Sequence, residues 1–129
     1  MASVFSKIIA GELPGHFIWE DDVCVVILTI QPLKPGHVLV VPREEIDHWD
    51  DLPVEVAAHL MQIAQKMAKA LKVAFPSLRV GLVIAGLEVP HTHVHVFPVD
   101  SIGDFDFTQA KPAFAEELEE VASKLRAAL

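Results

Sequence analysis

The sequence predicts an α+β fold: an antiparallel five-stranded sheet with one long helix and a C-terminal helix. Short runs rich in valine and isoleucine, separated by proline, glycine and aspartate, predict the strands. A long stretch in which apolar residues recur every three or four positions predicts the main helix. Strands before and after one main helix are typical of the α+β class. The predicted strands span residues 17–20, 23–30, 37–41, 79–85 and 91–99.

The N-terminal half of the chain contains a short helix and the first three strands. Residues 5–11 form the predicted helix, which ends at Gly11 because glycine readily terminates helices. An Asp-Asp pair at residues 21–22 predicts a hairpin turn between the first two strands. A proline- and glycine-containing loop then leads into the third strand, which Pro42 ends.

The main helix has recognisable start and stop signals. Asp51 is the predicted N-cap, Pro53 suits the first turn and Pro76 ends the helix. One face is apolar, and the opposite, solvent-facing side includes His59. The predicted buried face comprises Ala57, Leu60, Met61, Ala64, Met67, Leu71 and Ala74. A loop with alternating aspartates and phenylalanines follows the last strand, and residues 112–129 form the closing helix.

Composition limits the class of protein. A chain of 129 residues, 52% hydrophobic and 22% charged, fits one globular domain over residues 1–129. Its net charge of −8 argues against a nucleic-acid partner, because such proteins need basic surface to displace counterions. We expect no membrane partner and a cytoplasmic location, because the sequence has neither a signal-peptide pattern nor an apolar run of about 20 residues. The single cysteine, Cys24, excludes an internal disulfide and is expected to be an inert buried thiol.

Three histidines alternate with other residues near the end of the predicted sheet: His91, His93 and His95. Side chains alternate across a strand, so the three imidazoles are expected on one face, about 6–7 Å apart along the backbone. Such a row can bind a metal ion or a small anion such as a phosphate ester. Metal is the weaker interpretation, because the chain has no Cys-x-x-Cys pair and its nearby carboxylates lie only at the strand ends.

The segment His-Thr-His-Val-His-Val-Phe at residues 91–97 resembles the signature of the histidine triad (HIT) family. Upstream segments agree in order and spacing: FSKIIAGELP at 5–14, EDD at 20–22 and PGHVLVVP at 35–42. The resemblance covers a core motif region at residues 4–98 and leaves 99–129 as a C-terminal loop and helix.

The resemblance implies a nucleotidyl hydrolase or transferase that acts without a cofactor or catalytic metal, as a homodimer, on a small nucleotide substrate. The middle histidine, His93, is then the nucleophile, and its second ring nitrogen donates to a backbone carbonyl. His95 contacts the phosphate or leaving group, while His91 and His37 form a hydrogen-bonded relay behind it. The implied nucleotide-binding positions are Phe5, Ile8, Ile27, Thr29, Ile30, Leu87 and Glu88.

The chain also departs from the family pattern. Zinc-carrying members have cysteines at the positions of Ser3 and Ser6 and a histidine at that of Glu45, so no structural zinc is expected here. Thr29 stands where an acidic residue commonly binds the ribose hydroxyls. Residues 87–88, Leu-Glu, replace polar side chains that contact the phosphate. These departures leave open a catalytically weak nucleotide-binding homodimer and, less favoured, a histidine metal site.

Overall fold

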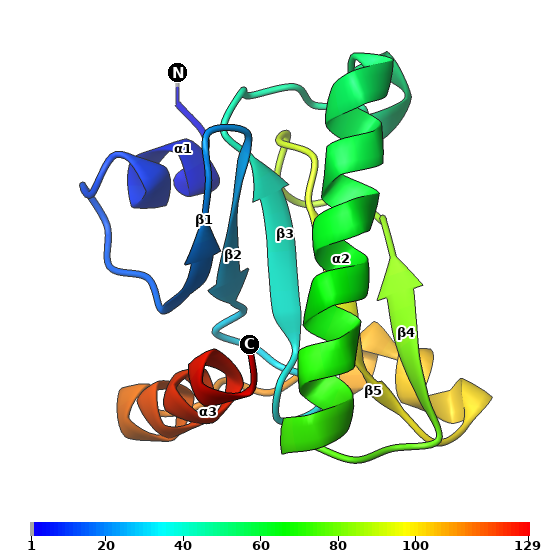
Figure 1. Cartoon of the computed structure of the whole chain (residues 1–129). Coiled ribbons are helices and arrows are strands. Elements are labelled where there is room, and N and C mark those ends of the chain that lie inside the picture. The colour runs from blue at the N-terminus through cyan, green and yellow to red at the C-terminus, as the bar shows by residue number, and fades with distance from the viewer. Residues whose placement is uncertain (1) are drawn as a thin grey trace.

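The computed structural model describes residues 2–129; Met1, the first residue of the predicted domain, lies outside them. It contains a five-stranded antiparallel sheet in the order β1-β2-β3-β5-β4, which confirms the α+β prediction. Helices α2 and α3 lie on the same side of the sheet (Figure 1). The elements are α1 (Val4–Ile9), β1 (Phe17–Glu20), β2 (Cys24–Leu28), β3 (Val38–Pro42), α2 (Val54–Ala74), β4 (Arg79–Val83), β5 (Val94–Val99) and α3 (Ala115–Ala128).

Both faces of the central strands are buried, which explains why β2 and β3 are continuous apolar runs. On one face, which we call the helix face, Cys24, Val26 and the other alternate residues pack against α2 and α3. On the opposite face, Val25, Ile27 and Leu39 pack with Phe5 of α1. Since His95 pairs directly with Leu39, its side chain belongs to this second face, which we call the histidine face.

Strand boundaries differ from the prediction mainly near the histidines. β1 has the predicted bounds, but β5 begins at Val94, so the predicted start at residue 91 is wrong. The backbone N–H and hydroxyl of Thr92 both donate to the carbonyl of Ile46, at 2.7 and 2.8 Å. The residues before Val94 are therefore bound to a loop instead of to a neighbouring strand.

The start of α2 also differs from the prediction. Asp51 is not the cap, because it ends a separate 3₁₀ turn (Trp49–Asp51), and Pro53 occupies the N-cap position without a side-chain acceptor. Met61 is 51% exposed, whereas Ile63 takes the buried position that the prediction had given to Met61. His59 is also misplaced: its Nε2 lies 2.7 Å from Asp21 Oδ2 at the β1–β2 turn.

Two 3₁₀ turns, η2 (Ile102–Phe105) and η3 (Phe107–Gln109), form the aspartate- and phenylalanine-containing loop after β5. They return the chain to the sheet, so that Phe105 packs on Phe97 and Phe107 packs on His95. Within residues 2–129, no helix combines the length and apolar character needed to cross a bilayer.

Candidate active site

The predicted histidines gather on the histidine face where the chain enters β5. His93 and His95 are adjacent, with ring centroids 5.1 Å apart, and the Phe5 ring lies 4.8 Å from that of His93. His37 immediately precedes β3 and lies beside His95, with ring centroids 5.1 Å apart. Elements distant in the sequence thus bring three imidazoles into one group.

His93 is held in one tautomer by its own chain. Its Nδ1–H donates to the carbonyl oxygen of His91 at 2.7 Å, an acceptor that cannot donate in return. The side chain is 7% exposed, and burial, the largest effect, lowers the pKa of His93. The ring is therefore neutral near pH 7 and keeps a lone pair on Nε2.

His95 and His37 form a directed pair. The backbone N–H of Leu33 donates to His37 Nδ1 at 3.0 Å, so His37 carries its proton on Nε2. That proton is donated to His95 Nδ1 at 2.9 Å, which leaves the His95 proton on Nε2. Burial, together with the smaller effect of a neighbouring imidazole, lowers the pKa of His37 to about 3 and that of His95 to about 4. The pair therefore stays neutral at pH 7.

His91 does not join this pair, so the predicted relay through His91 is wrong. Its fully buried ring donates from Nε2 to the carbonyl of Pro42 at 2.8 Å and accepts at Nδ1 from the Ser3 hydroxyl at 2.6 Å. Both ring nitrogens are thereby used. The residue acts instead through its backbone carbonyl, which holds His93.

Ser3, Ser6 and Glu45, where the resemblance stated above implies zinc ligands in other proteins, form a hydrogen-bonded cluster here. The backbone N–H of Ser3 and the hydroxyl of Ser6 both donate to Glu45 Oε1, at 2.6 and 2.7 Å. These two bonds hold the pKa of Glu45 below its usual range. Since Ser3 also caps α1 and contacts His91, the cluster ties the first helix to the histidines.

The predicted nucleotide-binding positions fall into separate groups. Phe5 and Ile27 are buried on the histidine face, and Ile8 packs beside them. At the end of β2, Ile30 is 68% exposed, while the Thr29 backbone N–H donates to the carbonyl of His37 at 3.3 Å. Phe5 therefore borders His93 and Thr29 borders His37, whereas the Ile30 side chain lies largely in solvent.

The last two predicted positions belong to the loop between β4 and β5. Leu87 is 92% exposed and Glu88 is exposed, so neither is packed into the core. The charge of Glu88 reaches His93, where it opposes the effect of burial on the pKa. This loop therefore carries a carboxylate whose charge acts on the histidine group.

Sequence reasoning missed two neighbours of the histidines. Phe107 lies 4.9 Å from the His95 ring, between centroids, and Ser3 binds the His91 ring. The aromatic loop and the Ser3 position were both recognisable in the sequence, but neither pattern indicates its long-range contact.

Comparison with known proteins gives consistent matches. A family model described as HIT domain matches residues 10–102. The adenosine 5'-monophosphoramidase HNT1 of Saccharomyces cerevisiae is 36% identical over 75% of this chain and 62% of its own length. The adenylylsulfatase HINT3 of Arabidopsis thaliana is 34% identical over 74% of this chain and 51% of its own.

The solved structures agree with the sequence matches. The crystal structure of a Hit-like protein from Bartonella henselae superposes with a TM-score of 0.86 and 31% identity, covering 98% of this chain and 96% of that one. The agreement extends over nearly the whole of both chains.

Proposed function

This chain belongs to the HIT family, and we propose that it cleaves a nucleoside monophosphate derivative through a covalent nucleotidyl-histidine intermediate on His93. The observation that carries the proposal is the fixed tautomer of His93, which leaves the Nε2 lone pair available next to the His95 ring. A neutral, oriented imidazole is the form that attacks phosphorus.

The proposed reaction has two displacements. In the first, His93 Nε2 forms a bond to phosphorus while the bond to the leaving group breaks. The Nε2–H of His95 donates a hydrogen bond to a phosphoryl oxygen or to the leaving group, and the leaving group takes its proton from solvent as it departs. In the second, water attacks phosphorus and loses a proton to solvent, the P–Nε2 bond breaks with its electron pair returning to His93 Nε2, and the nucleoside monophosphate is released. No metal is used in either step.

The substrate class rests on relatives and on the surroundings of the histidines. Similar proteins are an adenosine 5'-monophosphoramidase and an adenylylsulfatase, so we propose nitrogen- or sulfate-linked adenylates as substrates. The buried residues Phe5 and Ile27, with Ile8 beside them, offer an apolar wall for the nucleotide base. Thr29, Ile30, Leu87 and Glu88 complete the proposed nucleotide-binding set.

Replacement of the nucleophile tests the mechanism. His93→Ala is expected to lower kcat/KM for adenosine phosphoramidate by at least about four orders of magnitude. His95→Ala is expected to lower it by about 10²–10³-fold, the usual range for loss of a hydrogen-bond donor that stabilises the transition state. Acid-quenched wild type incubated with labelled substrate should carry label on the protein, and His93→Ala should not. Turnover by His93→Ala near the wild-type rate would overturn the mechanism, and His48→Ala, an exposed site, is the control.

A nucleotide-binding protein with weak catalysis is the second candidate. It is favoured by the exposed Glu88 carboxylate near His93, since a negative charge there repels a phosphate. Calorimetry with adenosine and guanosine monophosphates, run beside the turnover assay, separates the two candidates. Binding without hydrolysis over hours would support the second and contradict the first.

A homodimer is the proposed assembly. β4 forms one edge of the sheet and carries the 39% exposed Leu82. An unpaired edge strand offers backbone groups for pairing with a second chain. Sedimentation velocity at micromolar concentration should give the mass of a dimer, and a monomer at tens of micromolar would contradict the proposal.

A further inference from the structure

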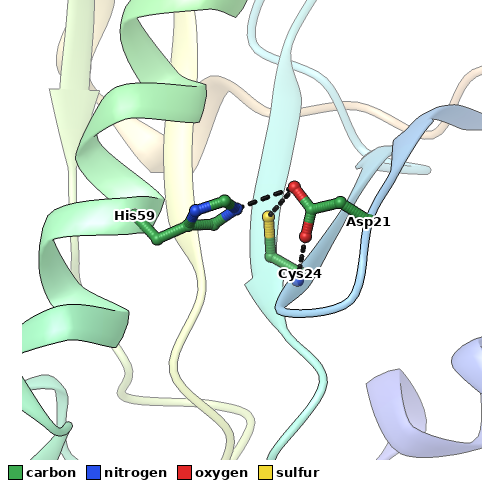
Figure 2. A group of neighbouring side chains, drawn as sticks. All are labelled: Asp21, Cys24 and His59. Carbon is green, nitrogen blue, oxygen red and sulfur yellow. Dashed lines mark hydrogen bonds and ion pairs between the residues drawn. The ribbon is translucent and has the colours of Figure 1, made fainter.

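A second group of polar side chains lies on the helix face, separated by the sheet from the histidine site. Asp21 follows β1, Cys24 begins β2 and His59 is on α2, and the three side chains point toward one another (Figure 2). Cys24 packs in the helix-face core, whereas His95 lies on the opposite face. The proposed hydrolase reaction therefore makes no use of this group.

The three side chains each offer one donor atom to a common point. His59 Nε2 lies 2.7 Å from Asp21 Oδ2, and Cys24 Sγ lies 3.7 Å from the same oxygen. All three donor atoms lie within 4.8 Å of one another. Tetrahedral zinc with bonds of about 2.0–2.3 Å places its ligand atoms about 3.3–3.6 Å apart. The distance from Cys24 Sγ to Asp21 Oδ2 already fits this geometry, and cation binding would lengthen the distance from His59 Nε2 to Asp21 Oδ2 by about 0.6 Å.

We propose that Asp21 Oδ2, Cys24 Sγ and His59 Nε2 bind a divalent cation of the zinc class. Combined sulfur, nitrogen and oxygen donors in a tetrahedral arrangement suit zinc better than magnesium or calcium, which prefer oxygen alone. The Asp21 and His59 side chains are 21% and 29% exposed, which leaves the fourth position to water. The cation joins α2 to the β1–β2 hairpin.

Asp21 is already oriented as metal-bound carboxylates usually are, by hydrogen bonds from neighbouring groups. The Trp19 indole N–H donates to Oδ2 at 2.8 Å, and the backbone N–H groups of Val23 and Cys24 donate to Oδ1 at 2.8 Å. Arg43 fixes the turn by donating to the Asp21 carbonyl at 2.6 Å. The carboxylate therefore holds its position before any cation binds.

Binding exchanges a proton for the cation. Without a cation, the Cys24 thiol donates to Asp21, and burial, followed by the Asp21 charge, raises the pKa of the thiol to about 12. On binding, the S–H bond breaks, its proton passes to solvent, and sulfur bonds to the metal. His59 then carries its proton on Nδ1, which leaves the Nε2 lone pair for the cation.

A cobalt titration of the full chain tests the proposal, because a thiolate bound to Co²⁺ gives a charge-transfer absorption band that imidazole and carboxylate ligands do not. The chelator-treated wild type should develop this band and saturate at one equivalent. Cys24→Ala should abolish the band, and His59→Gln should weaken Co²⁺ binding by more than about tenfold. Trp19→Phe, which removes one of the three hydrogen bonds that orient the Asp21 carboxylate, should weaken it by about 10–100-fold.

Two further measurements distinguish binding at Asp21, Cys24 and His59 from binding at the other histidine group. His93→Ala should keep the full band, since a band lost in that variant would place cobalt at the other histidine group and overturn the proposal. Zn²⁺ should raise the unfolding temperature of the wild type and of His93→Ala but not of His59→Gln, whose partly exposed helix position tolerates the change. No band in the wild type, or a band that persists in Cys24→Ala, would also overturn it.

Discussion

His91 illustrates how a residue whose ring takes no part in the proposed chemistry can decide the geometry of the proposed nucleophile, His93. Its ring is fixed at both nitrogens, by the Pro42 carbonyl and the Ser3 hydroxyl. A fixed ring fixes its backbone, and the His91 carbonyl is the acceptor that sets the tautomer of His93. The Ser3 hydroxyl therefore acts on the proposed nucleophile through two hydrogen bonds in series.

Removing the Ser3 hydroxyl is expected to destabilise the protein. Ser3→Ala leaves His91 Nδ1 without a donor in a fully buried site, and an unsatisfied buried polar atom costs about 1–3 kcal/mol. Urea unfolding at pH 7 measures the loss. Ser6→Ala is the matched control: its hydroxyl bonds to the exposed carboxylate of Glu45, so its loss should cost less than about 1 kcal/mol. Equal losses in the two variants would contradict this role for Ser3.

At the scale of elements, the turn before β3 couples the main helix to the histidines. Gly36 has φ +94°, and a Cβ there would lie 2.7 Å from Leu71 and 3.0 Å from Phe75 at the end of α2. Only glycine allows both this backbone conformation and this close approach of the helix. The residue that follows is His37, so the packing of α2 positions the pair formed by His37 and His95.

Gly36→Ala should therefore reduce both stability and activity. Left-handed strain costs about 1 kcal/mol, and the overlap with α2 adds to it, so we expect a loss of at least about 2 kcal/mol together with a lower kcat. Gly86→Ala separates the two effects, because Gly86 also has positive φ, +67°, but open space around its Cβ position. It should lose only about 1 kcal/mol. Similar losses in both variants would show that packing on α2 contributes nothing.

Local patterns predicted most elements, and long-range contacts account for the errors. β1 and the apolar runs of β2 and β3 were predictable because composition and turn residues mark their ends. The start of β5 was not, because Thr92 bonds to the carbonyl of Ile46, a partner that no local pattern indicates. Helical spacing located α2 but placed Met61 inside and His59 outside, since the tilt of the helix on the sheet decides which residues at the edge of its apolar face are buried.

The candidate site shows the same division between local and long-range information. The alternation of His93 and His95 is visible in the sequence, and the resemblance to the family added His37. The different environment of His91 was not visible, because it depends on Ser3 and Pro42, residues 88 and 49 positions away.

At the scale of the whole molecule, the buried histidines lower the free energy of unfolding by an amount that depends on pH. His37, His93 and His95 are packed against the sheet as neutral rings, and burial lowers the pKa of each. The unfolded chain has no such burial, so its histidines titrate near 6.5. Between the lowered pKa values of the folded state and the value of about 6.5 in the unfolded chain, the unfolded state binds more protons than the folded state.

The free energy of unfolding is therefore expected to fall as the solution is acidified below about pH 6.5. The folded pKa values of His37 and His95 are about 3 and about 4, so each imidazole contributes a slope of up to about 1.4 kcal/mol per pH unit over the interval down to those values. Carboxylates with lowered pKa values, such as Asp21 and Glu45, act in the same direction but mostly below about pH 5. Urea unfolding between about pH 7.5 and pH 5 therefore reports mainly on the histidines.

A variant at His37 isolates the contribution of one imidazole to the pH dependence of the unfolding free energy. His37→Asn keeps an acceptor for the Leu33 backbone N–H but removes the titrating ring, so the slope between about pH 6 and pH 5 should fall by about 1.4 kcal/mol per pH unit. His48→Asn, whose side chain is 71% exposed, should leave the slope unchanged because its ring meets water in both states. A wild-type stability that stays constant from about pH 7 to pH 5 would mean that the rings take up protons over the same pH range in the folded and unfolded states, which contradicts the lowered pKa values. In that case His93 would lose the Nε2 lone pair that the proposed displacement requires as the pH falls through about 6.5.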